Sequence, residues 1–308
     1  MQQLNFRLAA VPPYRLDLTA WALRRRGDNA IDSWDGRSYR RVLELGGGPI
    51  EVVAVQEARA LPRLAVQLTG AQLTRETEAA AKAALLRLLG LETNLCPFYG
   101  LAADDPFLGP LTKRFRGLKP PRLPTLFECL VNAIACQQLT LTVGIRLLNR
   151  LAETYGAPVR DGGPRTFPEP AQLAGLSAES LRPLGFSRAK ALSIVALAGA
   201  IETGAFDTKA IESLDDEDAV GALMRLRGIG RWSAEYALLR GLGRLNVFPG
   251  DDVGARNNLA RRLQLKGPLD YAAVQDAVRP WQPFAGLVYF HLLLANLADR
   301  GVLMAPVA

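Results

Sequence analysis

The sequence predicts a mainly helical protein with a small α+β domain at its N-terminus. Residues 1–72 contain short segments in which apolar and polar residues alternate, as in antiparallel strands. From Thr74 onward the apolar residues recur every three or four positions, as on one face of a helix. Two of these helical patterns meet at a short glycine turn, residues 226–230. We therefore expect an antiparallel sheet domain over 1–72 and an all-helical region over 73–308.

Composition limits the class of protein. At 308 residues, 49% of them hydrophobic and 22% charged, the chain can fold and bury a core. Its net charge of +7 favours a polyanionic partner, since lysine and arginine displace the counterions of phosphates. A membrane span needs roughly 18–20 uninterrupted apolar residues, and a secretion signal begins with a basic and then an apolar stretch. Neither pattern occurs, so we expect a cytosolic protein with no membrane partner.

Few residues could ligate a metal or build a histidine-based active site. The chain has three cysteines, Cys96, Cys129 and Cys136. The odd number and the lack of a C-x-x-C motif argue against disulfides, a zinc site and an iron–sulfur cluster. The only histidine, His291, lies in an apolar run typical of a core residue. No cofactor is expected, and Ser-His-Asp chemistry is disfavoured.

The N-terminal strands are separated by clear turn signals. Gly46-Gly47-Gly48-Pro49 predicts a hairpin between the strand around Tyr39 and Val42 and the strand 50–55. The remaining predicted elements are strands at 4–8 and 63–68 and a helix from Tyr14 to Arg26.

The first body helix begins at Thr74, with Thr77 and Glu78 in its first turn, and ends at Gly90. Residues 91–124 are proline-rich and are predicted to be a long connection. Its basic side chains, available for phosphate contact, are Lys113, Arg114, Arg116 and Lys119.

Helical periodicity continues to the end of the chain. Ser213, with Asp216, is predicted to cap the helix before the glycine turn. Further helices are predicted at 125–134, 143–155, 171–176, 177–184, 187–204, 213–224 and 234–241, from Asp251 or Asp252 to 263, and at 270–278 and 284–297.

Glycines 228 and 230 let the backbone of the turn adopt conformations in which a side chain would clash. The turn then exposes main-chain N–H groups that can hold a phosphate or a cation. An ordinary connector between two helices is the alternative.

Several motifs together resemble the helix–hairpin–helix (HhH-GPD) DNA glycosylase superfamily. The hairpin motif Leu-x-Gly-Ile-Gly-x-x-x-Ala at 226–234 is followed by Pro-Gly-Asp-Asp-Val at 249–253, and 228–236 is similar to the bacterial 3-methyladenine DNA glycosylase II (AlkA) branch. The resemblance covers about 72–300. It implies two helical subdomains flanking a cleft, and hydrolytic excision of alkylated bases from damaged double-stranded DNA. Supporting segments are Ala135–Thr140, Leu184–Ala191 and Arg279–Pro283.

The chemistry needs a fixed carboxylate. Breaking an N-glycosidic bond builds positive charge on the sugar, which an opposing carboxylate stabilises. Asp252 aligns with the catalytic aspartate of the family, and we expect its neighbour Asp251 to cap the following helix. The alternative is that one or both carboxylates only cap that helix.

Aromatic residues are candidates for the base pocket. Trp232 and Tyr236 are four residues apart and so lie on one helix face, which is also typical of core residues. With Trp281 they match three aromatic positions that line the pocket in the AlkA branch. Such a pocket favours cationic alkylated purines through cation–π attraction.

Position 232 also bears on the mechanism. Bifunctional members of the superfamily carry a Schiff-base lysine there, whereas this chain has Trp232. The resemblance therefore implies a monofunctional glycosylase, in which water attacks the sugar and no strand is cleaved. The chain also lacks the four-cysteine cluster of the endonuclease III and adenine-mismatch branches.

A flipped nucleotide leaves a gap in the duplex that a wedge residue fills. We assign the wedge to Gln138, with Leu139 as the alternative and Gln137 beside them; solvent-facing helix ends are the other interpretation. The hairpin residues expected to hold the DNA backbone are Arg227, Gly228, Gly230 and Arg231, and the family adds a possible sodium, potassium or magnesium ion on main-chain carbonyls near Leu226 and Ile229.

Two other functions stay open at this point. An enzyme for oxidised or deaminated purines, such as 8-oxoguanine or hypoxanthine, would share the fold and the pocket. A non-catalytic DNA-binding module would use the hairpin only to hold phosphates, with salt-sensitive binding that ignores damage. Engagement of one duplex by one chain favours a monomer.

Overall fold

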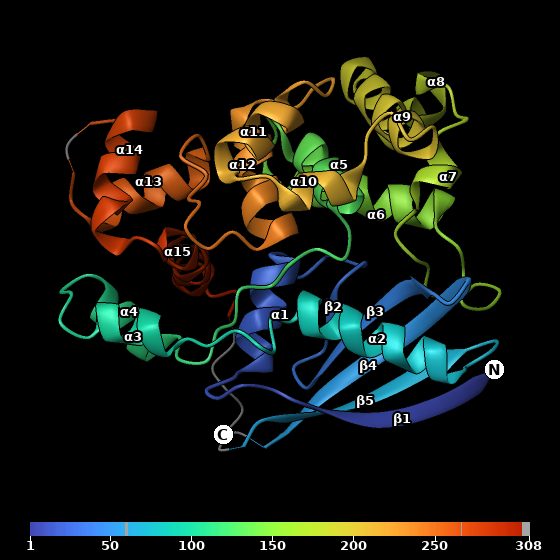
Figure 1. Cartoon of the computed structure of the whole chain (residues 1–308), viewed down its shortest axis with the longest axis horizontal. Coiled ribbons are helices and arrows are strands. Elements are labelled where there is room, and N and C mark those ends of the chain that lie inside the picture. The colour runs from blue at the N-terminus through green and yellow to red at the C-terminus, as the bar shows by residue number, and fades with distance from the viewer. Residues whose placement is uncertain (59–60, 266, 304–308) are drawn as a thin grey trace.

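The computed structural model describes residues 1–58, 61–265 and 267–303 of the chain. It confirms the predicted class, a helical body with a small antiparallel sheet domain at the N-terminus (Figure 1). Within the described residues, no helix has the length and apolar content needed to cross a membrane.

The N-terminal sheet has five antiparallel strands in the order β1-β5-β4-β3-β2. The predicted glycine hairpin is present, with Leu45 paired to Gly48. The predicted helix is also present as α1, Leu16–Arg24. The strands are β1 Gln2–Ala9, β2 Ser33–Trp34, β3 Ser38–Leu45, β4 Gly48–Ala58 and β5 Arg63–Gly70.

One face of this sheet is covered by helices. Alternate residues of β5, Leu64, Val66 and Leu68, are buried and belong to the same core cluster as apolar residues of α1 and α2. Figure 1 shows α2, Arg75–Leu88, lying across the sheet. Thr74 caps α2 in a capping box with Thr77, as the sequence predicted.

The segment predicted as a connection, 91–124, in fact contains two short helices, α3 and α4. Their apolar side chains, such as Phe98 and Leu108, are fully buried, so tertiary packing overrides the proline-rich composition. Lys119 is also fully buried and its Nζ donates to the carbonyl of Thr93, so it is not available to phosphate.

The cap predicted at Ser213 is wrong, because Ser213 is the last residue of another short helix, α10. Asp215 caps the next helix instead, and its side chain accepts from the N–H of Asp218. The body helices are α3 Cys96–Ala102, α4 Leu108–Arg114, α5 Leu126–Cys136, α6 Leu141–Tyr155, α7 Pro170–Leu173, α8 Ala178–Leu181, α9 Arg188–Glu202, α10 Thr208–Ser213, α11 Asp216–Met224, α12 Arg231–Ala237, α13 Val253–Arg262, α14 Tyr271–Val278 and α15 Ala285–Asp299.

The body divides into two packed groups of helices. One core cluster joins α5, α6, α9, α11 and α12 with the sheet, and the other joins α3, α4 and α13–α15 with the opposite side of α1. Helix α1 therefore contacts both groups, and Figure 1 shows it at the centre of the molecule.

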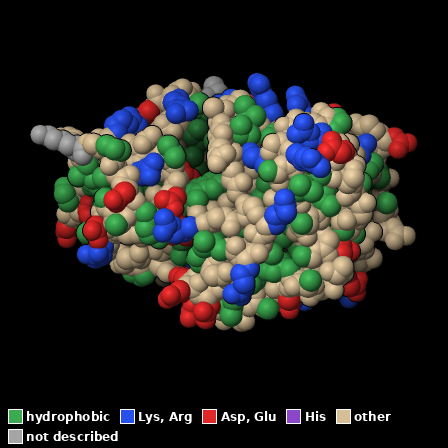
Figure 2. All heavy atoms as spheres, turned by 90° about the horizontal axis from the view of Figure 1, so that it is seen from above, with side chains coloured by type: hydrophobic (Ala, Val, Ile, Leu, Met, Phe, Trp, Pro, Cys, Tyr) green, Lys and Arg blue, Asp and Glu red, His purple; other side chains and the backbone are tan. Residues whose placement is uncertain are grey.

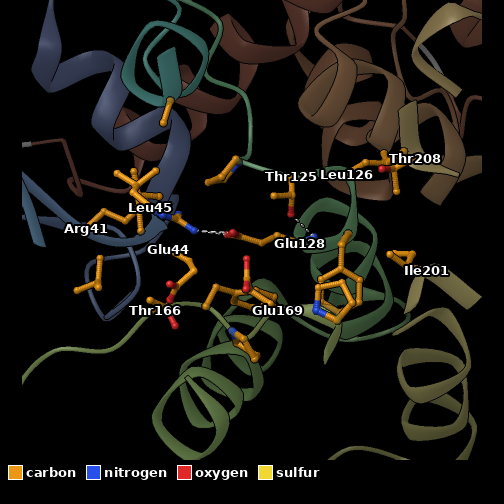
Figure 3. A pocket seen from close by; sticks show the side chains of 18 residues that line it. Arg41, Glu44, Leu45, Thr125, Leu126, Glu128, Thr166, Glu169, Ile201 and Thr208 are labelled. Carbon is orange, nitrogen blue, oxygen red and sulfur yellow. Dashed lines mark hydrogen bonds and ion pairs between the residues drawn. The ribbon is translucent and has the colours of Figure 1, made fainter. Parts of the chain in front are cut away.

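A buried ionic cluster connects the sheet to α5. The Arg41 guanidinium on β3 donates to Asp32 at 2.8 Å and to Glu128 at 2.5 Å, and Tyr39 donates its hydroxyl to Asp32 at 2.6 Å. Figure 3 shows Arg41 and Glu128 pointing toward each other beside a cavity of about 310 Å³. Burial raises the pKa of the Glu128 carboxyl, while the charge of Arg41 works in the opposite direction.

Candidate active site

The glycine turn joins α11 to α12 and requires glycine at one position. Gly228 has a φ of 75°, and a Cβ there would lie 2.3 Å from the Oγ of Ser193 on α9. The close approach packs the turn against α9. It also fixes the start of α12, the helix that carries Trp232 and Tyr236.

Asp252 lies at the N-terminus of α13 and caps it. Its Oδ1 accepts from the backbone N–H of Ala255 at 2.8 Å. Our expectation that Asp251 is the cap is therefore wrong. Asp252, directly before Val253, has the extended backbone of an N-cap, and its side chain accepts from an N–H of the first helical turn.

The second carboxylate oxygen of Asp252 faces two donors from other elements. Its Oδ2 accepts from the Tyr289 hydroxyl at 2.9 Å and from the Trp232 indole nitrogen at 3.4 Å. Burial, and then the charge of Asp252, raise the pKa of Tyr289 well above its ordinary value, so this phenol remains a proton donor. The carboxylate is thus held in one orientation by α12, α13 and α15.

Asp251 has a different environment. Its Oδ2 accepts from Nε of Arg231 at 2.8 Å, and both side chains are part-exposed. The Arg231 guanidinium lies 3.9 Å from the centre of the Tyr271 ring. Arg231, expected to hold the DNA backbone, is therefore engaged within the protein, and a phosphate would have to share its guanidinium with Asp251.

The loop that carries the two aspartates is held from behind by Glu235. This buried carboxylate accepts from the N–H of Gly250 at 3.1 Å and from the Tyr271 hydroxyl at 2.5 Å. A Cβ on Gly250 would lie 2.7 Å from the Tyr271 ring, so the loop packs closely on α14. Glu235 and Trp232 share α12, which fixes the distance between the aromatic residue and Asp252.

Of the three predicted aromatic residues, Trp232 contacts the Asp252 carboxylate and Tyr236 lies next to Trp232. The rings of Trp232 and Tyr236 are 5.6 Å apart and tilted by 40°. Trp232 is half-buried, whereas Tyr236 is buried and donates its hydroxyl to Asn132 Oδ1 at 3.0 Å. Trp232 can therefore stack on a ligand, and Tyr236 forms a fixed wall.

Trp281 lies on the other group of body helices. Its indole nitrogen donates to Asp105 at 2.7 Å, and its ring stacks on Phe107 at 5.0 Å. It is buried in the second core cluster, apart from the cluster of Tyr236. A role for Trp281 in the base pocket stays a prediction that these contacts do not carry.

The wedge candidates follow α5. Gln137 turns inward, and its Nε2 donates to the carbonyl of Gly228 at 2.8 Å and to the Ser233 hydroxyl at 2.9 Å. Gln138 and Leu139 are both exposed, and Gln138 has a φ of 52°. This placement favours Gln138 or Leu139 over Gln137 as the wedge, and the assignment stays a prediction.

The hairpin residues expected at the DNA backbone, Arg227, Gly228 and Gly230, are all exposed. The two carbonyls proposed to hold a cation are those of Leu226 and Ile229. The Leu226 carbonyl already accepts from the N–H of Ile229. Within the described ranges, no group of three or more His, Cys, Asp or Glu side chains could hold a metal ion.

The face that carries these elements is hollowed. Figure 2 shows a hollow between the α13–α14 part of the surface and the middle of the molecule, with hydrophobic side chains inside it. Lys and Arg side chains lie on both sides of this hollow in the same view. Asp and Glu side chains lie near the hollow as well, so charges of both signs border it, and the Lys and Arg among them are available to a polyanion.

Sequence reasoning missed Tyr289, Glu235 and Asn132, which contact Asp252, its loop and Tyr236. A signal existed for Tyr289, because a tyrosine in an otherwise apolar helix needs a partner for its hydroxyl. The sequence could not name that partner, since Asp252 lies 37 positions away.

The chain is similar to known proteins over most of its length. Residues 131–283 match the family model of the HhH-GPD superfamily base excision DNA repair proteins. The chain is 28% identical to the DNA-3-methyladenine glycosylase 2 of Escherichia coli over 89% of this chain and 92% of that protein.

Two solved structures are similar as well. A 3-methyladenine DNA glycosylase from Archaeoglobus fulgidus matches with a TM-score of 0.83 and 26% identity, over 94% of this chain and 98% of that one. A Schizosaccharomyces pombe 3-methyladenine DNA glycosylase in complex with abasic DNA matches with a TM-score of 0.57 and 28% identity, over 66% and 97%. The chain belongs to the HhH-GPD superfamily of base excision DNA repair proteins, and its homologues include 3-methyladenine DNA glycosylases.

Proposed function

We propose that this protein is a monofunctional DNA glycosylase that excises alkylated bases, chiefly 3-methyladenine and 7-methylguanine, from double-stranded DNA by hydrolysis. The observation that carries the proposal is Asp252. Its carboxylate is oriented by three donors and lies beside an aromatic residue, Trp232, that can stack on a base. The names of the homologues support the substrate class.

The reaction follows from this arrangement. The damaged base leaves the helix and stacks on Trp232, which places its sugar next to Asp252. As the N-glycosidic bond breaks, its electron pair goes to the base and positive charge develops on the sugar, where the Asp252 carboxylate stabilises it. Water then attacks the sugar carbon, and the proton it loses passes to solvent or to Asp252.

The DNA partner is supported by the net charge, the exposed glycine hairpin and the abasic-DNA complex of the yeast relative. Gln138 or Leu139 would fill the gap left by the flipped nucleotide. Arg227, Gly228 and Gly230 would hold the backbone next to it. One chain engages one duplex, so we propose a monomer.

A panel of lesions tests the proposal. Duplexes carrying 7-methylguanine, 3-methyladenine, hypoxanthine and 8-oxoguanine are incubated with the protein, and free base is measured. Release of the alkylated purines is expected. Binding that ignores damage and releases no base would instead identify a non-catalytic module, and release of 8-oxoguanine alone would identify an oxidised-base enzyme.

We predict that no covalent intermediate forms with DNA. Trp232 occupies the position where a Schiff-base lysine would stand, so borohydride should trap no protein–DNA adduct and the abasic product strand should stay intact. A bifunctional glycosylase run in parallel shows that trapping works. An adduct with this protein at a comparable yield would refute the monofunctional mechanism.

We predict that Tyr289→Phe lowers the single-turnover rate of base release by roughly tenfold, as expected for losing one hydrogen bond to a charged group. The variant keeps the ring and removes only the hydroxyl that donates to Asp252 Oδ2. Affinity for DNA, measured by fluorescence anisotropy, should not change. An unchanged rate would mean that the Ala255 and Trp232 contacts orient the carboxylate sufficiently.

A further inference from the structure

Arg25 brings a buried positive charge from the N-terminal domain to the wall of the base pocket. It follows the last residue of α1 and is almost fully buried. Its Nη2 donates at 2.8 Å to Asn132 Oδ1, which also accepts from the Tyr236 hydroxyl. Its Cζ lies 6.0 Å from the centre of the Tyr236 ring.

A second buried guanidinium lies near the same ring. Arg240 is fully buried, and its Cζ lies 5.6 Å from the Tyr236 ring centre. It is held by the last turn of α1, where its Nη2 donates to the carbonyls of Ala22 at 2.9 Å and Leu23 at 3.3 Å. Helix α1 thus supplies one of the two charges and fixes the other.

Neither charge is neutralised by a carboxylate contact. Across residues 1–58, 61–265 and 267–303, no ion pair within 4.0 Å includes Arg25 or Arg240. The Nε atoms of Arg25 and Arg240 are buried and have no hydrogen-bond partner among the described residues. Burying an unpaired charge is costly, so packing alone does not account for these residues.

The backbone of Arg25 adds to that cost. Its φ of 59° is in the left-handed region, where a helix C-terminus normally has glycine. Glycine would adopt this left-handed backbone conformation without burying a charge. What arginine adds over glycine at this position is its buried guanidinium, which hydrogen-bonds Asn132 beside Tyr236.

We propose that Arg25 sets the charge preference of the base pocket, by favouring lesions that leave as anions over lesions that are cationic in DNA. The inference rests on the proposed glycosylase function and concerns the same pocket. In a cationic nucleoside such as 7-methylguanine, the electron pair of the broken bond neutralises the base. In a neutral nucleoside, such as the one that carries hypoxanthine, the same electron pair makes the departing base an anion.

The positive potential of Arg25 acts oppositely on these two cases. It stabilises negative charge that develops on a neutral lesion as the bond breaks. It opposes a cationic base near Tyr236, because two guanidinium groups already lie close to that ring. Trp232 remains available for stacking, so Arg25 widens the range of lesions and does not exclude the alkylated ones.

The test compares single-turnover rates on 7-methylguanine and hypoxanthine in the same duplex for wild type, Arg25→Met and Arg25→Lys. Arg25→Met is expected to lower the rate on hypoxanthine relative to that on 7-methylguanine by on the order of tenfold, the effect of one charge several ångströms away at an effective dielectric constant near 20. Arg25→Lys should keep most of the wild-type ratio.

Arg24→Met is the matched control. Arg24 is equally buried and adjacent, but its guanidinium donates to the carbonyls of Trp34 and Gly27 within the N-terminal domain. Arg24→Met removes a buried charge but leaves the pocket unchanged. Its ratio of the rates on hypoxanthine and 7-methylguanine should therefore equal that of wild type. Thermal melting of each variant identifies any that fails to fold. If Arg25→Met does, Arg25→Gln removes the charge in its place and is expected to show the same lowered ratio.

The outcomes separate the inference from the proposed function. A wild type that releases neither base overturns the glycosylase proposal. A wild type that releases 7-methylguanine but no hypoxanthine, or an Arg25→Met ratio equal to that of wild type and Arg24→Met, overturns the role of Arg25 alone.

Discussion

Asp252→Asn is expected to lower the rate of base release by on the order of 10²-fold or more, the usual effect of removing a group that stabilises charge in the transition state. The substitution is nearly isosteric and keeps an oxygen that can accept from Ala255, and asparagine caps helices about as well as aspartate. The loss would therefore report the missing charge and not a damaged α13. Release of 7-methylguanine under single-turnover conditions measures it.

Asp251→Asn is the control for this experiment. Asp251 is the neighbour of Asp252 in sequence, yet its carboxylate pairs with Arg231 at the surface. Exposed ion pairs of this kind contribute at most about 1 kcal/mol, so activity should stay within a few-fold of wild type. Equal base release by Asp252→Asn and wild type, or a larger loss in Asp251→Asn, would contradict the assignment of the catalytic carboxylate.

Which of the two aspartates caps α13 could not be predicted from the sequence. Both aspartates precede α13, and aspartate is a preferred N-cap residue, so either could cap the helix. The choice depends on the path of the loop, which is fixed by the Gly250 contact to Glu235 and by the packing of that glycine on Tyr271. These contacts join residues 15 and more positions apart, and no local pattern encodes them.

Local signals predicted the elements whose stability is local. The capping box at Thr74 and the hairpin between Leu45 and Gly48 were both read from a few adjacent residues. The helices within 91–124 were missed because burial of Phe98 and Leu108 stabilises them, and neither propensity nor periodicity is strong over seven residues.

The candidate site shows the same limit. The motif around Trp232 predicted that this helix carries site residues, and the structure places Trp232 beside Asp252 as a hydrogen-bond donor. Tyr289 lies on α15 and Arg25 directly follows α1, so the two come from opposite ends of the chain. Their roles depend on tertiary packing around α1, which contacts both groups of body helices.

Arg41→Met is expected to destabilise the fold by about 3–5 kcal/mol, the range for removing one partner of a buried ion pair. Arg41 is the only cation that hydrogen-bonds Asp32 and Glu128 among the described residues, and without it both carboxylates stay buried and uncompensated. At roughly 2–4 °C per kcal/mol for a protein of this size, the melting temperature should fall by about 10 °C. Calorimetry or urea unfolding measures this.

The neighbouring Arg40 provides the control. It lies on the same strand but is half-exposed, and its contact to Asp35 is long, at 3.8 Å. Arg40→Met should change the free energy of unfolding by less than about 1 kcal/mol. A similar loss in both variants would mean that the strand, and not the buried cluster, is sensitive to substitution.

The pH dependence distinguishes charge burial from lost packing. Burial raises the pKa of Glu128 in the folded protein, and without Arg41 nothing in the cluster opposes that rise. A carboxyl whose folded pKa lies above its unfolded value contributes its stability below the unfolded pKa and loses it as pH rises through the folded pKa. The deficit of Arg41→Met against wild type should therefore be larger at pH 7.5 than near pH 4.5, where the freed carboxyl is protonated. A deficit that is constant across this range would assign the loss to packing of the arginine side chain instead.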